Sequence, residues 1–292
     1  MKKVLITGAN SYIGANSYIG TSLEKWLQQS EEQYHVDTLD MIDPNWKTFD
    51  FSPYDSIFHV AAIVHKNEKQ MNSDLYEKVN TKLPIELATI AKHSGLRQFI
   101  FLSSMSVYGN DTEEITRETR ENPSSYYGKS KLAAEIGLKD LQSDSFKVLI
   151  LRPPMVYGPQ ATGNYSRLSK LSKFTPIFPK VANKRSMIYL DNLLEFVRLS
   201  IETELSGIHF PQNKDYVTTS QLVNVIRQVN GKSTLLTSLF NPIIKSLKGF
   251  SQINKLFGNL VYSKEMSQEA FDYNVTGFEE SIRISERNNE KI

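Results

Sequence analysis

The chain has 292 residues, enough for one large domain or two smaller ones. Its 34 Lys and Arg residues against 32 Asp and Glu leave a formal charge of +2, which gives no reason to expect nucleic acid as a partner. The absence of cysteine excludes thiolate nucleophiles, disulfides and cysteine-ligated metals, and we expect no metal site. No apolar run approaches the roughly 18 residues of a membrane span, and the N-terminal MKKVLITG is too short in apolar residues for a signal peptide, so the expected location is cytoplasmic.

Apolar β-rich runs alternate with segments of helical period, which predicts repeated βαβ units around a buried parallel sheet, an α/β fold. Strands are expected at KVLIT, YHVDTLD, SIFHVAA, RQFIFLSS and KVLILRPP. Helices are expected at LYEKVNTKLPIELATIAKHSG, where Gly95 is the stop signal, at YYGKSKLAAEIGLKDL and at LDNLLEFVRLSI, followed by a mostly helical tail.

The first strand ends in GANSYIGANSYIG, residues 8–20, in which ANSYIG is written twice. A strand, a glycine turn and a helix N-terminus together bind a pyrophosphate through backbone N–H groups. One arrangement starts the helix near Gly14 and makes it six residues too long. We prefer the other, in which residues 14–20 form the loop and the first copy bulges out, because the helix then stays in register. The expected cofactor-binding residues are Gly8, Gly14, Ser17, Tyr18, Ile19 and Gly20.

Asp40 closes the run YHVDTLD, 20 residues past Gly20. A carboxylate at this place accepts hydrogen bonds from the adenosine ribose and repels a 2′-phosphate, which favours NAD over NADP. The alternative is an ordinary turn residue before MIDP.

Tyr127 and Lys131 stand four residues apart at the start of a helical stretch, so they share one face. An ammonium beside the tyrosine, together with a positive nicotinamide ring, would favour the phenolate needed for acid–base chemistry. A hydroxyl from SSMS, at the C-terminal end of a central strand, could share the substrate oxygen. In isolation, the pair would more often be a plain helix-surface contact.

Taken together, TGANSYIG, HVAA, SSMSVYG, YYGKSK, LRPPMVYGP and RSMIYLDNL resemble the extended short-chain dehydrogenase/reductase superfamily, in its nucleotide-sugar epimerase/dehydratase branch, UDP-glucose 4-epimerase among it. The likeness covers nearly the whole chain. It implies a Rossmann-type doubly wound parallel sheet carrying NAD over residues 1–158, with 187–212 packing back onto it. A smaller, mostly helical domain over 159–292 would bind the nucleotide sugar, and a homodimer is the family's usual assembly.

The resemblance also implies roles for individual residues. The catalytic set is Ser104, Tyr127 and Lys131, and the last two also contact the cofactor. Further cofactor contacts are implied for Asp50, Phe51, Ala61, Ala62, Asn80 and Pro154. Substrate contacts are implied for Ser104, Ser106, Met155, Asn164 and Arg185, the last gripping the diphosphate.

Two departures narrow the expected reaction. Dehydratases of this family carry an Asp-Glu pair after the catalytic hydroxyl, where this chain has Met105 and Ser106, so dehydration is not expected. Met155 stands where many epimerases have an asparagine. The remaining reactions are epimerisation at C4 of a UDP-sugar through a 4-keto sugar, and reduction of a 4-keto sugar. A catalytically silent regulator that binds NAD or a nucleotide sugar is the alternative from another class.

The tail from Tyr216 to Lys264 has six basic residues and no Asp or Glu, and its apolar residues recur at helical spacing. A basic amphipathic stretch over 239–260 predicts peripheral contact with an anionic membrane. The commoner alternative, which we favour, is that this apolar face packs as core and the positive field attracts a UDP-sugar.

Overall fold

The computed structural model describes residues 1–8, 16–64, 73–109, 112–247 and 250–287. These residues divide into two compact units. The first unit comprises Met1–Gly109, Arg120–Pro153 and Leu194–Pro211, and the second comprises Asn110–Thr119, Pro154–Leu193 and Gln212–Ile292. The predicted functional boundary at residue 158 stays a prediction.

A parallel sheet of six strands forms the centre of the first unit, in the order β10-β6-β4-β3-β1-β2. The strands are β1 (Lys2–Thr7), β2 (Tyr34–Leu39), β3 (Ser56–His59), β4 (Gln98–Leu102), β6 (Lys147–Leu151) and β10 (Gly207–His209). The order reverses beside β1, which has β2 on one side and β3 on the other. The predicted α/β doubly wound fold is confirmed, and such sheets bind ligands at their carboxyl edge next to the reversal.

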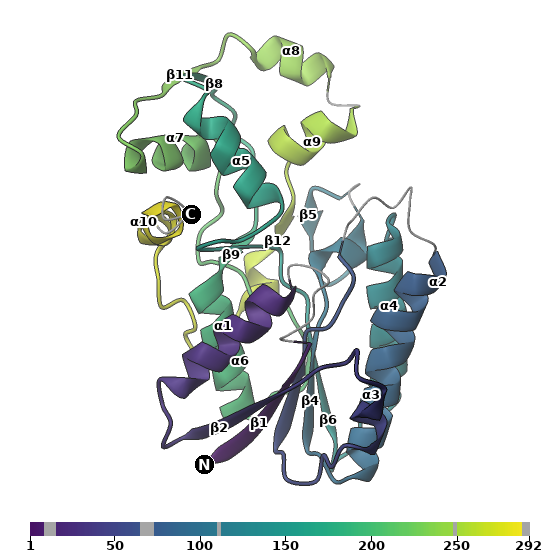
Figure 1. The fold of residues 1–292 in the computed structure, drawn as a ribbon. Coiled ribbons are helices and arrows are strands. Elements are labelled where there is room, and N and C mark those ends of the chain that lie inside the picture. Colours follow the sequence, from purple (N-terminus) through teal and green to yellow (C-terminus); the bar gives the residue numbers. More distant parts are fainter. Residues whose placement is uncertain (9–15, 65–72, 110–111, 248–249, 288–292) are drawn as a thin grey trace. The chain divides into compact units, whose positions relative to one another are not determined.

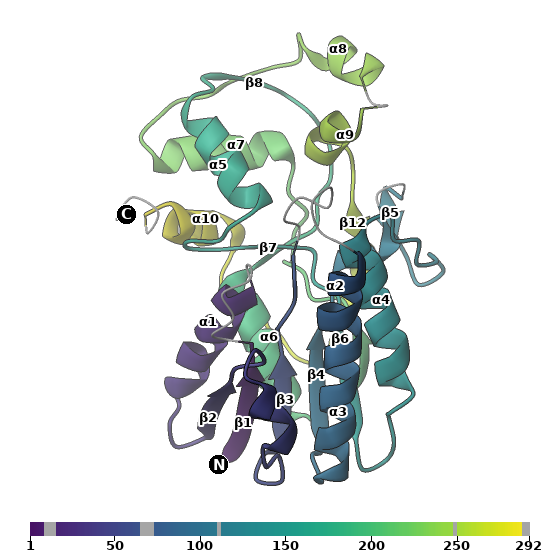
Figure 2. The same ribbon diagram turned by 45° about the vertical axis from the view of Figure 1, so that its right-hand side comes forward.

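Helices cover both faces of this sheet. They are α1 (Asn16–Gln28), α2 (Ser73–Tyr76), the π-helical turn η2 (Glu77–Lys82), α3 (Leu83–His93), α4 (Tyr126–Lys139) and α6 (Leu190–Glu202), with 3₁₀ turns η1 (Pro44–Thr48) and η3 (Met105–Tyr108). Figures 1 and 2 show α1 and α6 on one face, and α3 and α4 on the other. Trp26 of α1 donates a hydrogen bond to Glu195 of α6 at 3.2 Å.

The apolar pattern of each element explains its position. Ile19, Leu23 and Leu27 recur every four residues in α1 and are all buried, so one stripe of the helix faces the sheet. Strand β4, QFIFL, is buried at every residue, as expected of a central parallel strand. Gly95 follows α3 with a φ of 90°, a left-handed conformation that glycine adopts without strain, so the predicted helix stop is confirmed.

Short elements build the second unit. Its strands form three parallel pairs: β5 (Glu114–Ile115) with β12 (Val261–Tyr262), β7 (Met155–Tyr157) with β9 (Met187–Tyr189), and β8 (Ile177–Pro179) with β11 (Leu235–Thr237). Its helices are α5 (Asn164–Lys173), α7 (Thr219–Val229), α8 (Asn241–Ser246), α9 (Ser251–Phe257) and α10 (Phe278–Arg287), with the 3₁₀ turn η4 (Lys264–Ser267). None of the helices in the described ranges is long and apolar enough to cross a membrane.

Candidate functional site

The chemistry-bearing side chains of the first unit follow the carboxyl ends of neighbouring strands. Gly8 directly follows β1, Ala61 and Ala62 lie two and three residues after the end of β3, and Ser104 lies two residues after the end of β4. The β4–β6 pairing continues into this region, because the Ser103 N–H donates to Leu151 O at 2.7 Å. The backbone that carries Ser104 is therefore fixed by the sheet.

Ser104, Tyr127 and Lys131 are brought together at this edge. Ser104 caps the turn η3, its Oγ accepting from the Ser106 N–H at 3.1 Å, and its hydroxyl is hydrogen-bonded to Tyr127. Tyr127 lies in the first turn of α4, and Lys131 follows one turn later, with its Nζ 6.0 Å from the centre of the Tyr127 ring. Lys131 Nζ also donates to Leu102 O at 2.8 Å. The segment after β4 and the first two turns of α4 thus bring together the three side chains that the sequence analysis grouped.

Burial dominates the electrostatics of this cluster. Burial raises the pKa of Tyr127 above its usual range, and only the hydrogen bond with Ser104 acts in the opposite direction. Burial lowers the pKa of Lys131 to about 7, against a smaller upward effect of the Glu135 carboxylate. Lys131 therefore has an ammonium that could favour the phenolate only in its protonated form, because the buried lysine loses much of its own charge near neutral pH.

A buried ionic network behind Ser104 was missed by the sequence analysis. The Ser103 hydroxyl donates to Glu135, and the Arg152 Nε donates to both oxygens of the same carboxylate at 3.1 Å. Arg152 also donates to the Tyr108 hydroxyl at 2.6 Å, which ties down the other end of η3. Glu135 stands four residues after Lys131 and eight after Tyr127. This helical spacing places it on the same face as those two residues, and could have indicated it as a member of the site.

Gly128 permits the close packing of α4 on η3. A Cβ added there would lie 2.6 Å from the carbonyl oxygen of Ser106. A side chain at position 128, between Tyr127 and Lys131, would therefore clash with the backbone of η3. Such a clash would force Ser104 and Tyr127 apart. The Ser106 hydroxyl is itself buried.

His59, the last residue of β3, is a second group that the sequence analysis missed. Its Nδ1 lies 2.7 Å from the Thr7 hydroxyl, and its ring stacks near Phe99 and Phe101 at centroid distances of 6.0 and 6.2 Å. Burial lowers the pKa of His59 to about 3, and the charge of Lys131 adds to this effect. The imidazole is therefore neutral throughout the physiological range.

The carboxyl end of β1 fits a dinucleotide. Gly8 has a φ of 88°, and a Cβ added to it would lie 2.5 Å from the Ala61 Cβ, so only glycine permits this approach of the two strand ends. Asn80 is fully buried and holds the loop after Ala62, accepting from the Ile63 N–H at 2.8 Å and donating to Ile63 O at 3.0 Å. Asn80 therefore shapes the cofactor side of the site through this loop.

The helix after the doubled hexapeptide begins inside the second copy. Because α1 starts at Asn16 and includes Ser17, Tyr18, Ile19 and Gly20, the preferred interpretation of residues 14–20 as a loop is wrong from Asn16 onward. The buried stripe that starts at Ile19 explains why this copy joins the helix. Gly14, the rest of the first copy and the Ser17 side chain lie outside the described residues.

Three other predicted cofactor residues have partners within the chain. The Asp40 carboxylate accepts from the Ile42 N–H at 2.9 Å, which is the turn geometry of the alternative reading. The Asp50 carboxylate is exposed and accepts from the Ser52 N–H at 2.9 Å, and these hydrogen bonds lower its pKa. Phe51 is fully buried in the core beside Ile57, so its side chain does not face a ligand.

A pocket of about 300 Å³ in the second unit contains three of the predicted substrate residues. We call it the α5–α7–α9 pocket; it is lined by Met155, Asn164, Arg167, Leu168, Leu171, Arg185, Met187, Val217, Thr218, Thr219, Leu222, Lys255 and Leu256. It combines two arginines and one lysine with several aliphatic side chains, and no carboxylate is among these residues. Burial lowers the pKa of Arg185. A pocket with this charge suits an anion such as a diphosphate.

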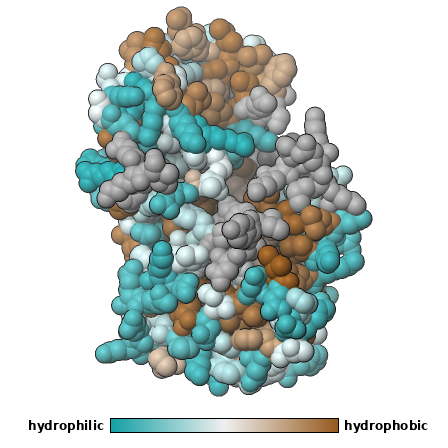
Figure 3. Space-filling model, in the orientation of Figure 1, coloured by the Kyte–Doolittle hydropathy of each residue, from teal (hydrophilic) through white to brown (hydrophobic). Residues whose placement is uncertain are grey.

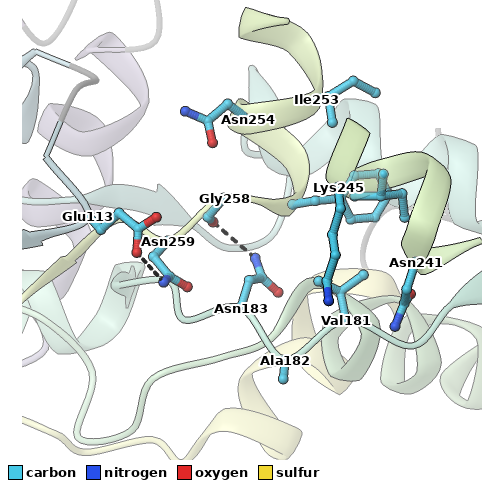
Figure 4. Close-up of a pocket in the computed structure, with 12 residues that line it drawn as sticks. Glu113, Val181, Ala182, Asn183, Asn241, Lys245, Ile253, Asn254, Gly258 and Asn259 are labelled. Carbon is cyan, nitrogen blue, oxygen red and sulfur yellow. Dashed lines mark hydrogen bonds between the residues drawn. The ribbon is translucent and has the colours of Figure 1, made fainter. Parts of the chain in front are cut away.

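A neighbouring pocket of about 260 Å³ uses other residues of α9 (Figure 4). Asn259 donates to the Glu113 carboxylate at 2.7 Å, and Asn183 donates to Gly258 O at 3.2 Å. None of the predicted site residues is among those that line it.

Pro154, a predicted cofactor contact, is buried and lies directly before β7, at the start of a segment of the second unit.

Comparison with known proteins gives a consistent result. Residues 4–209 match the family model described as the NAD dependent epimerase/dehydratase family. UDP-glucose 4-epimerase of Vibrio cholerae is 32% identical over 219 residues, which cover 69% of this chain and 67% of that protein. N-acetyl-alpha-D-glucosaminyl-diphospho-ditrans,octacis-undecaprenol 4-epimerase of Escherichia coli O157:H7 is 25% identical over 272 residues, covering 87% of this chain and 81% of that protein. Among solved structures, a dTDP-4-dehydrorhamnose reductase of Clostridium acetobutylicum has the same fold, with a TM-score of 0.73, 22% identity and coverage of 97% and 98%.

Proposed function

Because the chain belongs to the NAD dependent epimerase/dehydratase family, we propose that it is an NAD-dependent 4-epimerase of a nucleoside diphosphate sugar. The substrate in this proposal is a UDP-sugar, and the intermediate is a 4-keto sugar. The observation that carries it is the hydrogen-bonded pair Ser104–Tyr127 with Lys131 one helical turn away. A regulator that only binds ligands has no need of such a set.

NAD, when bound, supplies the acceptor and donor for the hydride at C4 of the sugar. Gly8 and Ala61 would hold its pyrophosphate side, and Asp40 the adenosine ribose. Tyr127 removes the proton from the 4-hydroxyl when C4 is oxidised and returns it to the same oxygen when C4 is reduced, while Ser104 hydrogen-bonds to that oxygen. Burial keeps Tyr127 protonated until substrate arrives. Lys131, which gains or loses its charge near pH 7, assists the phenolate when protonated.

The α5–α7–α9 pocket supports the choice of a diphosphate-linked substrate. Arg185 and Lys255 supply positive charge there, and Leu168 and Leu222 supply an apolar wall for a base. Both relatives are named for a sugar that is carried on a diphosphate. The carrier differs: it is uridine in one name and undecaprenol in the other. We assign uridine to this chain.

Dehydration lies outside the proposal. The two positions after Ser104 hold Met105, which is buried and cannot exchange protons, and Ser106, whose hydroxyl is a weak acid. Reduction of a 4-keto sugar is the second candidate, since it uses the same three residues.

The experiment is to incubate the protein with a panel of UDP-sugars and with undecaprenyl-diphosphate-linked N-acetylglucosamine, and to identify the products by NMR. Inversion at C4 with catalytic amounts of NAD is the expected result. In a second incubation with a UDP-4-keto sugar and NADH, inactivity on the other substrates together with consumption of one NADH per keto sugar would replace the epimerase with a reductase. NAD binding without turnover of any of these substrates would instead favour a catalytically silent regulator that binds NAD or a nucleotide sugar.

A further inference from the structure

The second unit exposes large apolar side chains on β8, β11 and α8 and on residues next to these elements, α5 and α9. Their exposed fractions run from 48% at Ile177 to 84% at Phe174. We call this set the exposed apolar patch; its members are Phe174, Ile177, Leu235, Leu239, Ile243 and Phe250. Scattered single exposures are ordinary, whereas a group of this size marks an interaction surface.

Hydrogen bonds join the elements that carry the patch. Ile177 and Leu235 are direct partners in the β8–β11 ladder, so they point to the same face. At the other end of the ladder the Leu239 N–H donates to the Thr237 hydroxyl at 3.2 Å, and the Asn241 side chain donates to Lys180 O at 3.0 Å. Helix α8 is therefore fastened to the end of the same short sheet. Figure 3 shows hydrophobic residues gathered over this part of the second unit, at the top of the view.

The apolar face of the tail packs only in part, because six of its large side chains are half-buried and three are exposed. Not one of its nine large apolar residues is buried in the structure: Phe240, Ile243, Ile244, Leu247, Phe250, Ile253, Leu256, Phe257 and Leu260. The helices here are short: α8 spans Asn241–Ser246, with Pro242 in its first turn, and α9 spans Ser251–Phe257. Two helices of this length cannot bury a stripe that one long helix would have covered.

The sequence segments that carry the patch have charged residues of one sign only. Residues 154–190 contain six Lys and Arg and no Asp or Glu, and residues 216–264 contain another six and again no acidic residue. Lys180, Lys232 and Lys245 are exposed. Lys232 Nζ lies 5.9 Å from the centre of the exposed Phe174 ring, so a cation stands beside an apolar side chain of the patch.

We propose that the second unit docks on an anionic phospholipid surface through the exposed apolar patch. Apolar side chains enter the boundary between headgroups and acyl chains, while the surrounding lysines bind lipid phosphates. A second copy of the chain is a poorer occupant, because a two-fold interface would set this basic face against itself. The docking does not depend on the proposed enzymatic activity.

Vesicle flotation of the full chain tests the docking directly. Vesicles of 30% phosphatidylglycerol in phosphatidylcholine should carry the protein, and vesicles of phosphatidylcholine alone should carry much less. The triple variant Leu239→Ser, Ile243→Ser, Phe250→Ser should lower the partition coefficient about tenfold or more. The matched control, Ile42→Ser with Val275→Ser, removes two equally exposed apolar side chains and should leave binding unchanged.

Charge gives a second measurement that does not depend on the triple variant. Lys180→Glu with Lys245→Glu should weaken binding at least about tenfold, and 0.5 M salt should weaken the binding of the unaltered chain. Equal flotation of the unaltered chain and both variants, or no flotation of any of them, overturns the proposal. A fall in molecular mass for the triple variant without vesicle binding would assign the patch to self-association instead.

Discussion

The basic side chains Lys131 and His59 of the first unit and Lys255 of the second unit lie in different environments. In the first unit Lys131 and His59 are fully buried, and burial lowers the pKa of Lys131 to about 7 and that of His59 to about 3. In the second unit Lys255 is exposed at the rim of the α5–α7–α9 pocket. The difference teaches that burial lets Lys131 lose its proton near neutral pH and keeps His59 neutral, whereas a basic side chain at the surface can meet an anion from solution.

The largest expected effect separates chemistry from binding in the first unit. Tyr127→Phe should lower turnover by about two orders of magnitude or more, the usual loss for a general acid–base group, while NAD still binds. Steady-state kinetics and calorimetry measure the two quantities. Tyr126→Phe is the matched control, because Tyr126 stands next to it and is 44% exposed. Unchanged turnover in Tyr127→Phe would remove the proposed mechanism.

The next effect should appear in binding alone. Arg185→Gln removes the half-buried charge of the α5–α7–α9 pocket, so KM for the UDP-sugar should rise roughly 10- to 100-fold, as for a lost hydrogen bond to a charged group. Affinity for NAD should not change. Arg117→Gln, at an exposed arginine of the same unit, serves as control. If kcat fell and KM stayed constant, the pocket would not be the diphosphate site.

The buried imidazole predicts a dependence of stability on pH. His59 takes up a proton below its ordinary pKa of 6.5 in the unfolded chain, but only below about 3 in the folded chain. The unfolded state therefore binds more protons between these values, and the free energy of unfolding falls as the pH is lowered through that window.

Replacing His59 by Gln should remove part of this fall, on the order of 2 kcal/mol between pH 7 and pH 4.5. Urea unfolding at both pH values measures it, with the exposed His93→Gln as control. The same fall in the His59 variant and in the unaltered chain would show that the imidazole is not the titrating group.

The smallest expected effect concerns the doubled hexapeptide. Deleting residues 15–20 joins the remaining ANSYIG directly to Thr21, so that this copy can begin the helix and six fewer residues must be ordered beside the pyrophosphate. NAD should bind about threefold tighter or more, and the melting temperature should rise. Calorimetry and thermal unfolding measure the two changes. Weaker binding by the shortened chain would make the extra copy a working part of the site.

The sequence predicted those features that depend on local periodicity. The strands and the pairing of Tyr127 with Lys131 follow from alternation and from helical spacing. Glu135 was missed because its partner Arg152 is distant in sequence and only the fold brings them together. The start of α1 was misplaced because the repeated hexapeptide ANSYIG offers two equivalent positions for the loop and the helix start. Burial of Ile19, in the second copy, decides between them. The pKa of Tyr127 could not be inferred, since desolvation depends on the complete packing.

The most direct test of the proposed epimerase uses UDP-glucose with deuterium at C4. Incubation with the protein and a catalytic amount of NAD should yield UDP-galactose that retains deuterium at C4, with no net formation of NADH, as NMR and absorbance would measure. The same reaction with Tyr127→Phe should be slower by about two orders of magnitude or more. Loss of the deuterium on inversion, or net formation of NADH with no inversion at C4, would contradict the assignment of a 4-epimerase.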